Sequence, residues 1–171
     1  TWTYRVGGVL LKKEISFDTS IHRIYVRYTL LDAHSETTLR LRPFLAFRSV
    51  RQWTHENNVA NRSYDEVENG IRMCLYQGYP DLYMQTSKPA QWNYCPDWYR
   101  GMDYPKERER GYNATEDLLV PGYFEMPIKK GETITFSAGI APIKPEQIDV
   151  MLEKEIANID HRDSFYHCLV N

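Results

Sequence analysis

Apolar and polar residues alternate along several short stretches of the chain, as expected for strands that bury one face. The clearest case is residues 23–30, which place Ile24, Val26, Tyr28 and Leu30 on one face and Arg23, Tyr25, Arg27 and Thr29 on the other. Residues 9–17 predict a strand that follows a turn at Gly7-Gly8. Residues 38–47 alternate as well, but Pro43 interrupts them and predicts a bulge or an edge position there.

The middle of the chain predicts short strands between polar loops. We expect a loop over residues 52–69, strands over 71–76 and 82–86, an extended aromatic segment over 92–104, and a charged connector over 106–110. Residues 122–128 and 132–140 predict a hairpin around Lys129-Lys130-Gly131, in which glycine can adopt the left-handed conformation.

The hydrophobic period changes near the end of the chain. The apolar residues Ile148, Met151, Leu152, Ile156 and Ile159 follow helical spacing. Pro145 suits the first turn of that helix, and a second helix is expected to begin near Asp163. Many short strands followed by helices predict a mainly β fold, an antiparallel β-sandwich with C-terminal helices. The expected division is a β-sandwich over residues 1–144 and a helical exit segment over 145–171.

Composition narrows the function classes. The net charge of −2 argues against a nucleic-acid partner, and no apolar stretch is long enough to predict a membrane span. The three cysteines form no CxxC pair, so we expect a reducing, cytoplasmic location. The five histidines form no compact metal motif and no nucleotide-binding signature is present, so neither a metal nor a cofactor is expected.

Two adjacent carboxylates, Glu116 and Asp117, invite a test for glycoside hydrolysis. That chemistry needs two carboxyl groups on either side of the scissile bond. Neighbouring side chains of an extended segment point to opposite faces, so this pair is poorly placed for it. The preferred interpretation is structural: one of them caps a turn or pairs with Arg108 or Arg110.

An aromatic stretch at residues 92–99 allows two interpretations. Trp92, Trp98 and Tyr99 could stack on sugar rings, with Asn93 and Asp97 binding hydroxyl groups. The alternative, which we favour, is that these rings fill the core. The arginines at positions 23, 27, 40, 42, 48 and 51 alternate with apolar residues, and predict a solvated, ion-paired outer face rather than a phosphate site.

Several short sequence motifs, taken in their order along the chain, resemble those of one protein family. They are Tyr28-Thr29-Leu30-Leu31-Asp32-Ala33, residues 39–48 (LRLRPFLAFR), Asp97-Trp98-Tyr99, and Glu109-Arg110-Gly111 running into residues 116–122 (EDLLVPG). The chain thus resembles the N-terminal domain of bacterial and archaeal type glycogen debranching enzymes, the amylo-α-1,6-glucosidase family. The resemblance implies a supersandwich-like β domain that precedes an (α/α)6-barrel, and it places the hydrolytic carboxylates in that barrel. The segment Tyr112-Asn113-Ala114-Thr115 departs from the usual sequence of the family at this position.

Three functional hypotheses follow. The first is an accessory domain of a debranching glycosidase, inactive alone, which packs on the catalytic domain of the same parent chain and shapes its α-glucan site. The others are an autonomous carbohydrate-binding module and a structural or oligomerisation domain. Both chain ends have the appearance of cut points, which predicts a partial domain. Residues 110–122 predict a docking loop, and the candidate carbohydrate-binding or interface residues are Trp92, Asp97, Trp98, Tyr99, Arg110, Glu116 and Asp117.

Overall fold

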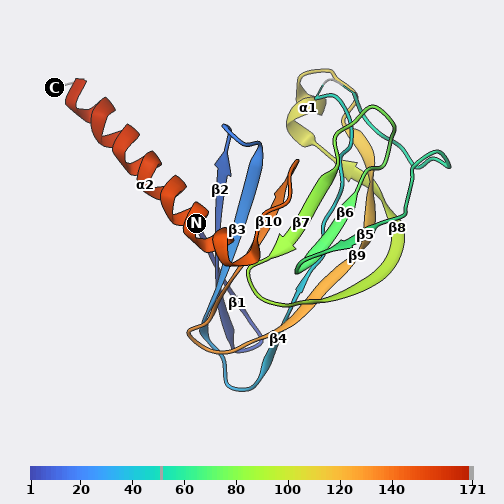
Figure 1. The fold of residues 1–171 in the computed structure, drawn as a ribbon. Coiled ribbons are helices and arrows are strands. Elements are labelled where there is room, and N and C mark those ends of the chain that lie inside the picture. The colour runs from blue at the N-terminus through green and yellow to red at the C-terminus, as the bar shows by residue number, and fades with distance from the viewer. Residues whose placement is uncertain (51, 170–171) are drawn as a thin grey trace.

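Two antiparallel sheets of unequal size pack face to face (Figure 1). The structure is a computed structural model that describes the backbone of residues 1–50 and 52–169, and side chains as far as Ile159. The larger sheet has seven strands in the order β1-β2-β3-β10-β7-β6-β5, and the smaller has three in the order β4-β9-β8. The predicted antiparallel β-sandwich is confirmed.

The strands of the larger sheet are β1 (Trp2–Val6), β2 (Val9–Asp18), β3 (Arg23–Asp32), β10 (Thr133–Gly139), β7 (Leu82–Thr86), β6 (Gly70–Met73) and β5 (Asp65–Val67). Those of the smaller sheet are β4 (Thr37–Leu41), β9 (Thr115–Ile128) and β8 (Gln91–Asp103). The strand predictions over 9–17, 23–30 and 82–86 are confirmed. The strand predicted over 38–47 ends at Leu41, before Pro43, and pairing with β9 resumes only at a single bridge between Leu45 and Leu119.

The main core lies between the two sheets. Leu30 and Ile134 from the larger sheet face Leu119, Phe124 and Met126 from β9, and these side chains are almost completely buried. Phe124 also contacts Phe136 of β10, with ring centroids 5.8 Å apart. Alternation in each sequence segment therefore places its apolar residues against the facing sheet.

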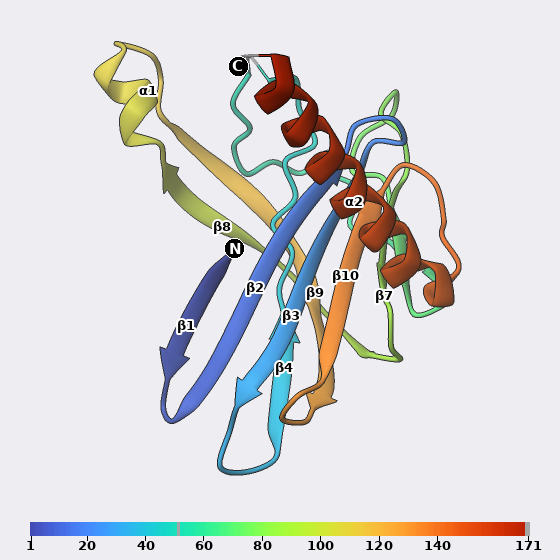
Figure 2. The same cartoon turned by 90° about the vertical axis from the view of Figure 1, so that its left-hand side faces the viewer.

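The opposite face of the larger sheet is partly covered by helix α2 (Pro145–Leu169), as Figure 2 shows. Ile148 and Leu152 pack on Tyr25 of β3 and form a second, smaller core. Arg27 forms ion pairs with Glu14 of β2 and Glu153 of α2. This face of β3 is therefore covered.

The prediction that the arginines line a solvated face is wrong for Arg23. Its side chain is 3% exposed, and its guanidinium donates hydrogen bonds to the Ser137 hydroxyl and the Ala141 carbonyl. Helix α2 and the residues before it cover this position, which strand alternation alone cannot indicate. Arg40 and Arg42 are exposed as expected, and Arg51 lies outside the described residues.

The predicted hairpin of residues 122–128 and 132–140 is wrong, although both strands exist. β9 pairs with β4 and β8, whereas β10 pairs with β3 and β7. The connection at Lys129–Glu132 carries the chain from one sheet to the other. Gly131 does adopt the left-handed conformation, with φ of 84°. A tight turn between two strands can join facing sheets as well as neighbouring strands, and the sequence pattern is the same in both cases.

The predicted docking loop of residues 110–122 is also wrong over most of its length. Only its first part is a loop, since β9 begins at Thr115 and is the central strand of the smaller sheet. Pro121 is tolerated there because the ladder with β8 is irregular between Tyr94 and Asp97. Gly122 is required there for close approach to β8.

Two helical predictions need correction. Residues 106–110, expected as a charged connector, lie largely in a short helix, α1 (Pro105–Glu109). The backbone of α2 continues to Leu169 without a break, so no second helix begins near Asp163. No helix among the described residues is long and apolar enough to span a bilayer.

One side of the sandwich is open because three strands face seven. Trp2, Tyr4, Ile15 and Phe17 lie on the core-facing side of β1 and β2, yet they are 44–53% exposed. Beside them a cavity of about 280 Å³ lies between the sheets, lined by Leu11, Tyr28 and Phe136 on one side and Leu39 and Leu41 on the other. We refer to the four exposed residues of β1 and β2, together with the residues that line this cavity, as the open side.

We expect Gly122→Ala to lower the free energy of unfolding by about 3 kcal/mol or more, because backbone strain and steric overlap combine. Gly122 has φ of 153°, and an added Cβ would lie 2.1 Å from the Asn93 carbonyl oxygen. The matched control is Gly111→Ala, where φ is 80° but no atom lies within 4 Å; its cost should be only about 1 kcal/mol. Urea denaturation of both variants measures the difference, and equal losses would contradict the close-approach argument.

Candidate functional site

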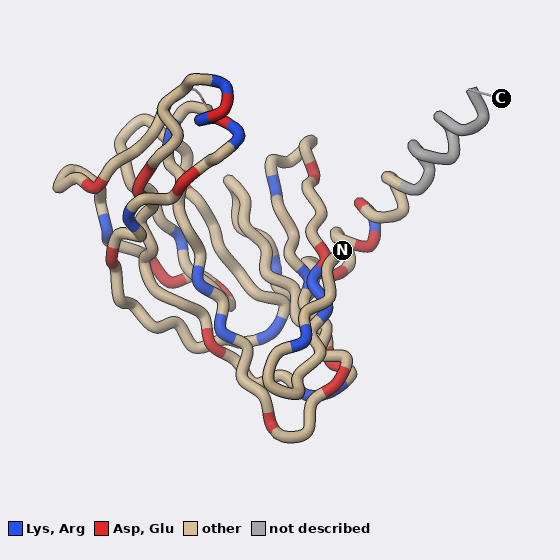
Figure 3. Tube along the Cα trace, turned by 180° about the vertical axis from the view of Figure 1, so that it is seen from behind, with Lys and Arg blue, Asp and Glu red and all other residues tan. Residues whose placement is uncertain are grey.

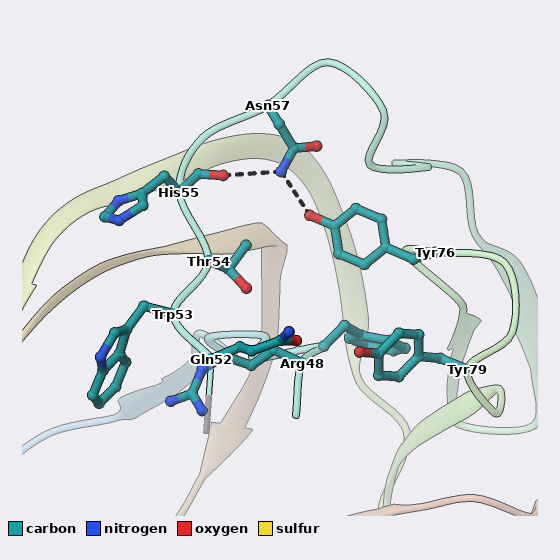
Figure 4. Close-up of a pocket in the computed structure, with 9 residues that line it drawn as sticks. Arg48, Gln52, Trp53, Thr54, His55, Asn57, Tyr76 and Tyr79 are labelled. Carbon is teal, nitrogen blue, oxygen red and sulfur yellow. Dashed lines mark hydrogen bonds between the residues drawn. The ribbon is translucent and has the colours of Figure 1, made fainter. Parts of the chain in front are cut away.

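An open groove lies beside the small sheet, where the segment after β4 meets the loop between β6 and β7. Its volume is about 510 Å³, within the range of small-molecule sites. The lining residues are Phe47, Arg48, Gln52, Trp53, Thr54, His55, Asn57, Tyr76 and Tyr79 (Figure 4). We call this feature the aromatic groove.

Three aromatic rings of the groove contact one another in sequence. Tyr79 lies between Phe47 and Tyr76, with ring centroids 6.3 Å and 6.4 Å apart and interplanar angles of 60° and 61°. The Cys74 thiol lies within hydrogen-bond distance of the Tyr76 and Tyr79 carbonyl oxygens, which fixes the turn that carries these rings. Tyr79 is 39% exposed, so much of its ring surface faces solvent.

The polar side of the groove is formed by residues 52–57, whose conformation Asn57 fixes. Its side-chain oxygen accepts the backbone N–H groups of Val59 and Ala60, and its side-chain nitrogen donates to the His55 carbonyl and the Tyr76 hydroxyl. The last of these bonds joins the polar segment to the aromatic turn, as the dashed lines in Figure 4 show.

A buried carboxylate holds the base of the groove. Glu116 is fully buried and accepts hydrogen bonds from Arg48 Nε at 2.6 Å and Nη2 at 2.9 Å. The Tyr104 hydroxyl also donates to it, at 2.5 Å. Trp53 stacks on Tyr104 at 4.9 Å, and the Arg48 guanidinium lies 4.7 Å from the Trp53 ring centroid. Glu116, Arg48, Trp53 and Tyr104 therefore form a closed set of contacts, which we call the Glu116 ring.

Asp117 anchors the same segment from the next position along β9. Its carboxylate accepts the backbone N–H groups of Glu56 and Gly101, each at 2.9 Å. Its own N–H donates to the Thr54 carbonyl at 2.7 Å. His55 Nδ1 lies 3.6 Å from the Asp117 carboxylate. Residues 54–56 are thus held against β9 at several points.

These contacts keep both carboxylates ionised. Burial by itself would raise the pKa of Glu116, but the hydrogen bonds from Arg48 and Tyr104 and the charge of Arg48 outweigh it and leave the pKa lowered. The pKa of Asp117 is lowered chiefly by the N–H groups of Glu56 and Gly101. A general acid needs the opposite shift, so neither group is suited to protonate a leaving oxygen.

The groove has the chemistry of a binding site. None of its described lining residues is an aspartate or a glutamate, whereas glycoside hydrolysis normally uses two such groups. Among the described residues, no cluster of three or more potential metal ligands occurs. Aromatic faces on one side and amide, hydroxyl and imidazole groups on the other are suited to a ligand with both apolar and hydroxyl surfaces.

The predicted site residues divide into three groups. Glu116 and Asp117 lie beneath the groove, and Tyr99, half exposed, contacts Phe44 beside it at 5.0 Å. Asp97 lies nearby, 3.6 Å from Arg100. Trp98 is 4% exposed within the core, and Trp92 packs on Phe124, in agreement with the core interpretation of these two rings. Arg110 pairs with Glu107 at 3.0 Å, next to α1.

Two sequence interpretations change at this site. Glu116 does have a structural role, but its partner is Arg48 rather than Arg108 or Arg110. Arg48 itself was expected on a solvated face, and its side chain is only 16% exposed. The groove-lining residues of the 52–57 loop and the 76–79 turn were missed. Their one sequence signal is the presence of Trp53 and Tyr79 in segments expected to be loops or turns, where large rings have no strand to pack on.

Fold and groove define an antiparallel β-sandwich domain with an open aromatic site. The family described as Glycogen debranching enzyme N terminal matches residues 1–135, and the chain belongs to this family. The expected family is thereby confirmed, and it indicates a glycogen-debranching glycoside hydrolase as the parent chain. Neither the curated proteins nor the solved structures provide a significant match.

We expect Glu116→Gln to lower the free energy of unfolding by about 3 kcal/mol, because it leaves a poorly exposed Arg48 without its counter-charge. The matched control is Glu107→Gln, which removes an ion pair whose arginine is 66% exposed and should cost less than about 1 kcal/mol. Chemical denaturation near neutral pH measures both variants. Similar losses in the two would show that the Glu116 ring does not hold the groove segment.

The lowered pKa of Glu116 also predicts how stability depends on pH. Its contribution is complete above the ordinary glutamate value of 4.5 and is lost as the pH falls through the lower, folded-state pKa. The stability difference between the wild type and Glu116→Gln should therefore narrow between about pH 5 and about pH 2. Urea titrations across that range measure the difference. A gap that stays constant would contradict the pKa shift.

Proposed function

We propose that this domain is an accessory part of a glycogen debranching enzyme, which packs on the (α/α)6-barrel catalytic domain of the same parent chain and helps shape the α-glucan site for α-1,6-glucosidic hydrolysis. The open side of the sandwich is the observation that carries the packing role. A cytoplasmic location belongs to the same proposal, since it is where glycogen-processing chemistry and unpaired cysteines are compatible.

The open side has the properties of an interface. Trp2, Tyr4, Ile15 and Phe17 lie on one largely apolar face that also contains Lys13, and the adjoining 280 Å³ cavity can accept a side chain from a partner. Contiguous exposed apolar patches of this kind mark surfaces that are covered in the assembled molecule. Their aromatic residues are the types that most often contribute strongly to binding.

The oligomerisation hypothesis was based on the apolar face of the C-terminal helix. That face is largely used within the domain, because Ile148 and Leu152 are buried against Tyr25. The autonomous carbohydrate-binding module stays as the second candidate, and the aromatic groove is the observation that favours it. This alternative would be favoured by two results together. The isolated chain would bind oligosaccharides without the catalytic domain, and substitutions at the open side would leave the stability of the parent enzyme unchanged.

We expect Phe17→Ser to lower the melting temperature of the parent enzyme by several degrees, since a buried aromatic contact at an interface typically contributes more than about 1 kcal/mol. In the isolated chain Phe17 is 53% exposed, so the same change should have a much smaller effect on stability. The control is Val59→Ser, an apolar residue that is 79% exposed on a distant loop. Differential scanning calorimetry measures the melting temperatures of the variants in the parent enzyme and in the isolated chain. Equal behaviour of Phe17→Ser and Val59→Ser in the parent would reject the open side as the interface.

The purified 171-residue chain should hydrolyse no α-1,6 linkage. The reason is that Glu116 and Asp117, the carboxylates beneath the groove, are both engaged in structural hydrogen bonds. Release of glucose from a branched dextrin, followed by a coupled assay, measures this activity. Turnover that disappears in Glu116→Gln would refute the accessory role.

A further inference from the structure

We infer that the aromatic groove binds a short α-1,4-linked glucose chain, with Tyr79 as its central stacking residue. This inference rests on the proposed function for its ligand class. It goes beyond that function by assigning the contact to residues 44–48 and 52–57 and to the 76–79 turn, rather than to the aromatic stretch at 92–99.

The arrangement of the rings favours a curved chain. Phe47, Tyr79 and Tyr76 are each turned by about 60° relative to the next ring. A β-1,4-linked glucan is a flat ribbon that needs nearly coplanar platforms, whereas an α-1,4-linked chain curves, and successive glucose units present their C–H faces at changing angles. Rings that are inclined to one another, as these three are in their edge-type contacts, can contact successive units of such a chain.

The electrostatics favour a neutral ligand. Arg48 is the one lysine or arginine among the described residues that line the groove, and Glu116 compensates its charge at 2.6 Å and 2.9 Å. Along the backbone trace of the domain, basic and acidic positions are interspersed (Figure 3). A phosphate or other anion would therefore find no uncompensated cation among these residues. Sugar hydroxyl groups, by contrast, can exchange hydrogen bonds with Gln52 and Thr54 on the polar side.

The site is rigid before any ligand arrives. The Glu116 ring fixes Arg48 and Trp53, Asn57 fixes the polar segment, and the Cys74 contacts fix the turn of Tyr76 and Tyr79. Side chains that are already ordered lose little entropy on binding, so weak contacts suffice for measurable affinity. This preorganisation assigns Glu116 a positioning role beneath the site.

The groove also has room for more than one glucose unit. A second, mostly apolar cavity of about 230 Å³ adjoins it and shares Phe47, Arg48 and Tyr79 with it. Phe44 lines this second cavity, and Tyr99 contacts Phe44 edge-on. Tyr79 therefore lies where the two cavities meet, and a chain that crosses both must pass its ring.

The test measures maltoheptaose binding to the 171-residue chain by calorimetry, and the KM and kcat of the parent enzyme on a branched dextrin. Tyr79→Ala should weaken binding or raise KM about tenfold, the effect of losing one stacking contact, and leave kcat unchanged. Tyr79→Phe keeps the ring and should remain close to wild type. The matched control is Tyr112→Ala, a tyrosine that is 66% exposed on the loop after α1. Cellohexaose should bind at least about tenfold more weakly than maltoheptaose.

The inference is overturned if Tyr79→Ala changes neither binding nor KM relative to Tyr112→Ala, or if cellohexaose binds as well as maltoheptaose. These outcomes are separable from failure of the proposed function. An unchanged KM in Tyr79→Ala together with a destabilised parent in Phe17→Ser rejects the groove and keeps the accessory role. A tenfold effect of Tyr79→Ala with no effect of Phe17→Ser keeps the groove and rejects the proposed interface.

Discussion

The buried carboxylate of Glu116 is the constraint on which the arrangement of the groove depends. A carboxylate without solvent requires charged and hydrogen-bonded partners, and Arg48 and Tyr104 supply them. Tyr104 directly follows β8 and Glu116 lies at the start of β9, and the ends of these two strands are paired, whereas Arg48 comes from the segment after β4. One electrostatic requirement therefore joins that segment to the small sheet. Trp53 then packs between Arg48 and Tyr104, and the loop that follows it takes its position along β9.

Two consequences follow from the unequal sheets. The seven strands of the larger sheet need more cover than the three of the smaller sheet provide. Helix α2 covers part of the outer face through Ile148 and Leu152, while Trp2, Tyr4 and Phe17 on the inner face are left partly exposed. The domain therefore has a partly exposed, largely apolar surface and, at a separate place, the aromatic groove.

The separation of these two surfaces is consistent with a division of labour in the parent enzyme. Carboxylates that hydrolyse a glycosidic bond must be free to exchange protons, and Glu116 and Asp117 are committed to holding backbone and side chains in place. In the accessory role that we propose, the domain would contribute shape and affinity, and bond cleavage would take place elsewhere in the parent enzyme. Membership of the debranching-enzyme family gives that reaction its substrate class.

The sequence by itself determined the β character, most strand positions, the helical end and the family, because alternation, turn residues and ordered phrases are local properties. It also determined that Glu116 and Asp117 do not form an acid/base pair, since neighbours in an extended segment diverge. Only the tertiary structure decided that β9 and β10 belong to different sheets, that Arg23 is buried and Arg48 partly covered, and that Tyr79 and Trp53 line one groove. Each of these depends on which distant segment covers a residue, and one side chain's environment in a sandwich is set by the facing layer rather than by its sequence neighbours.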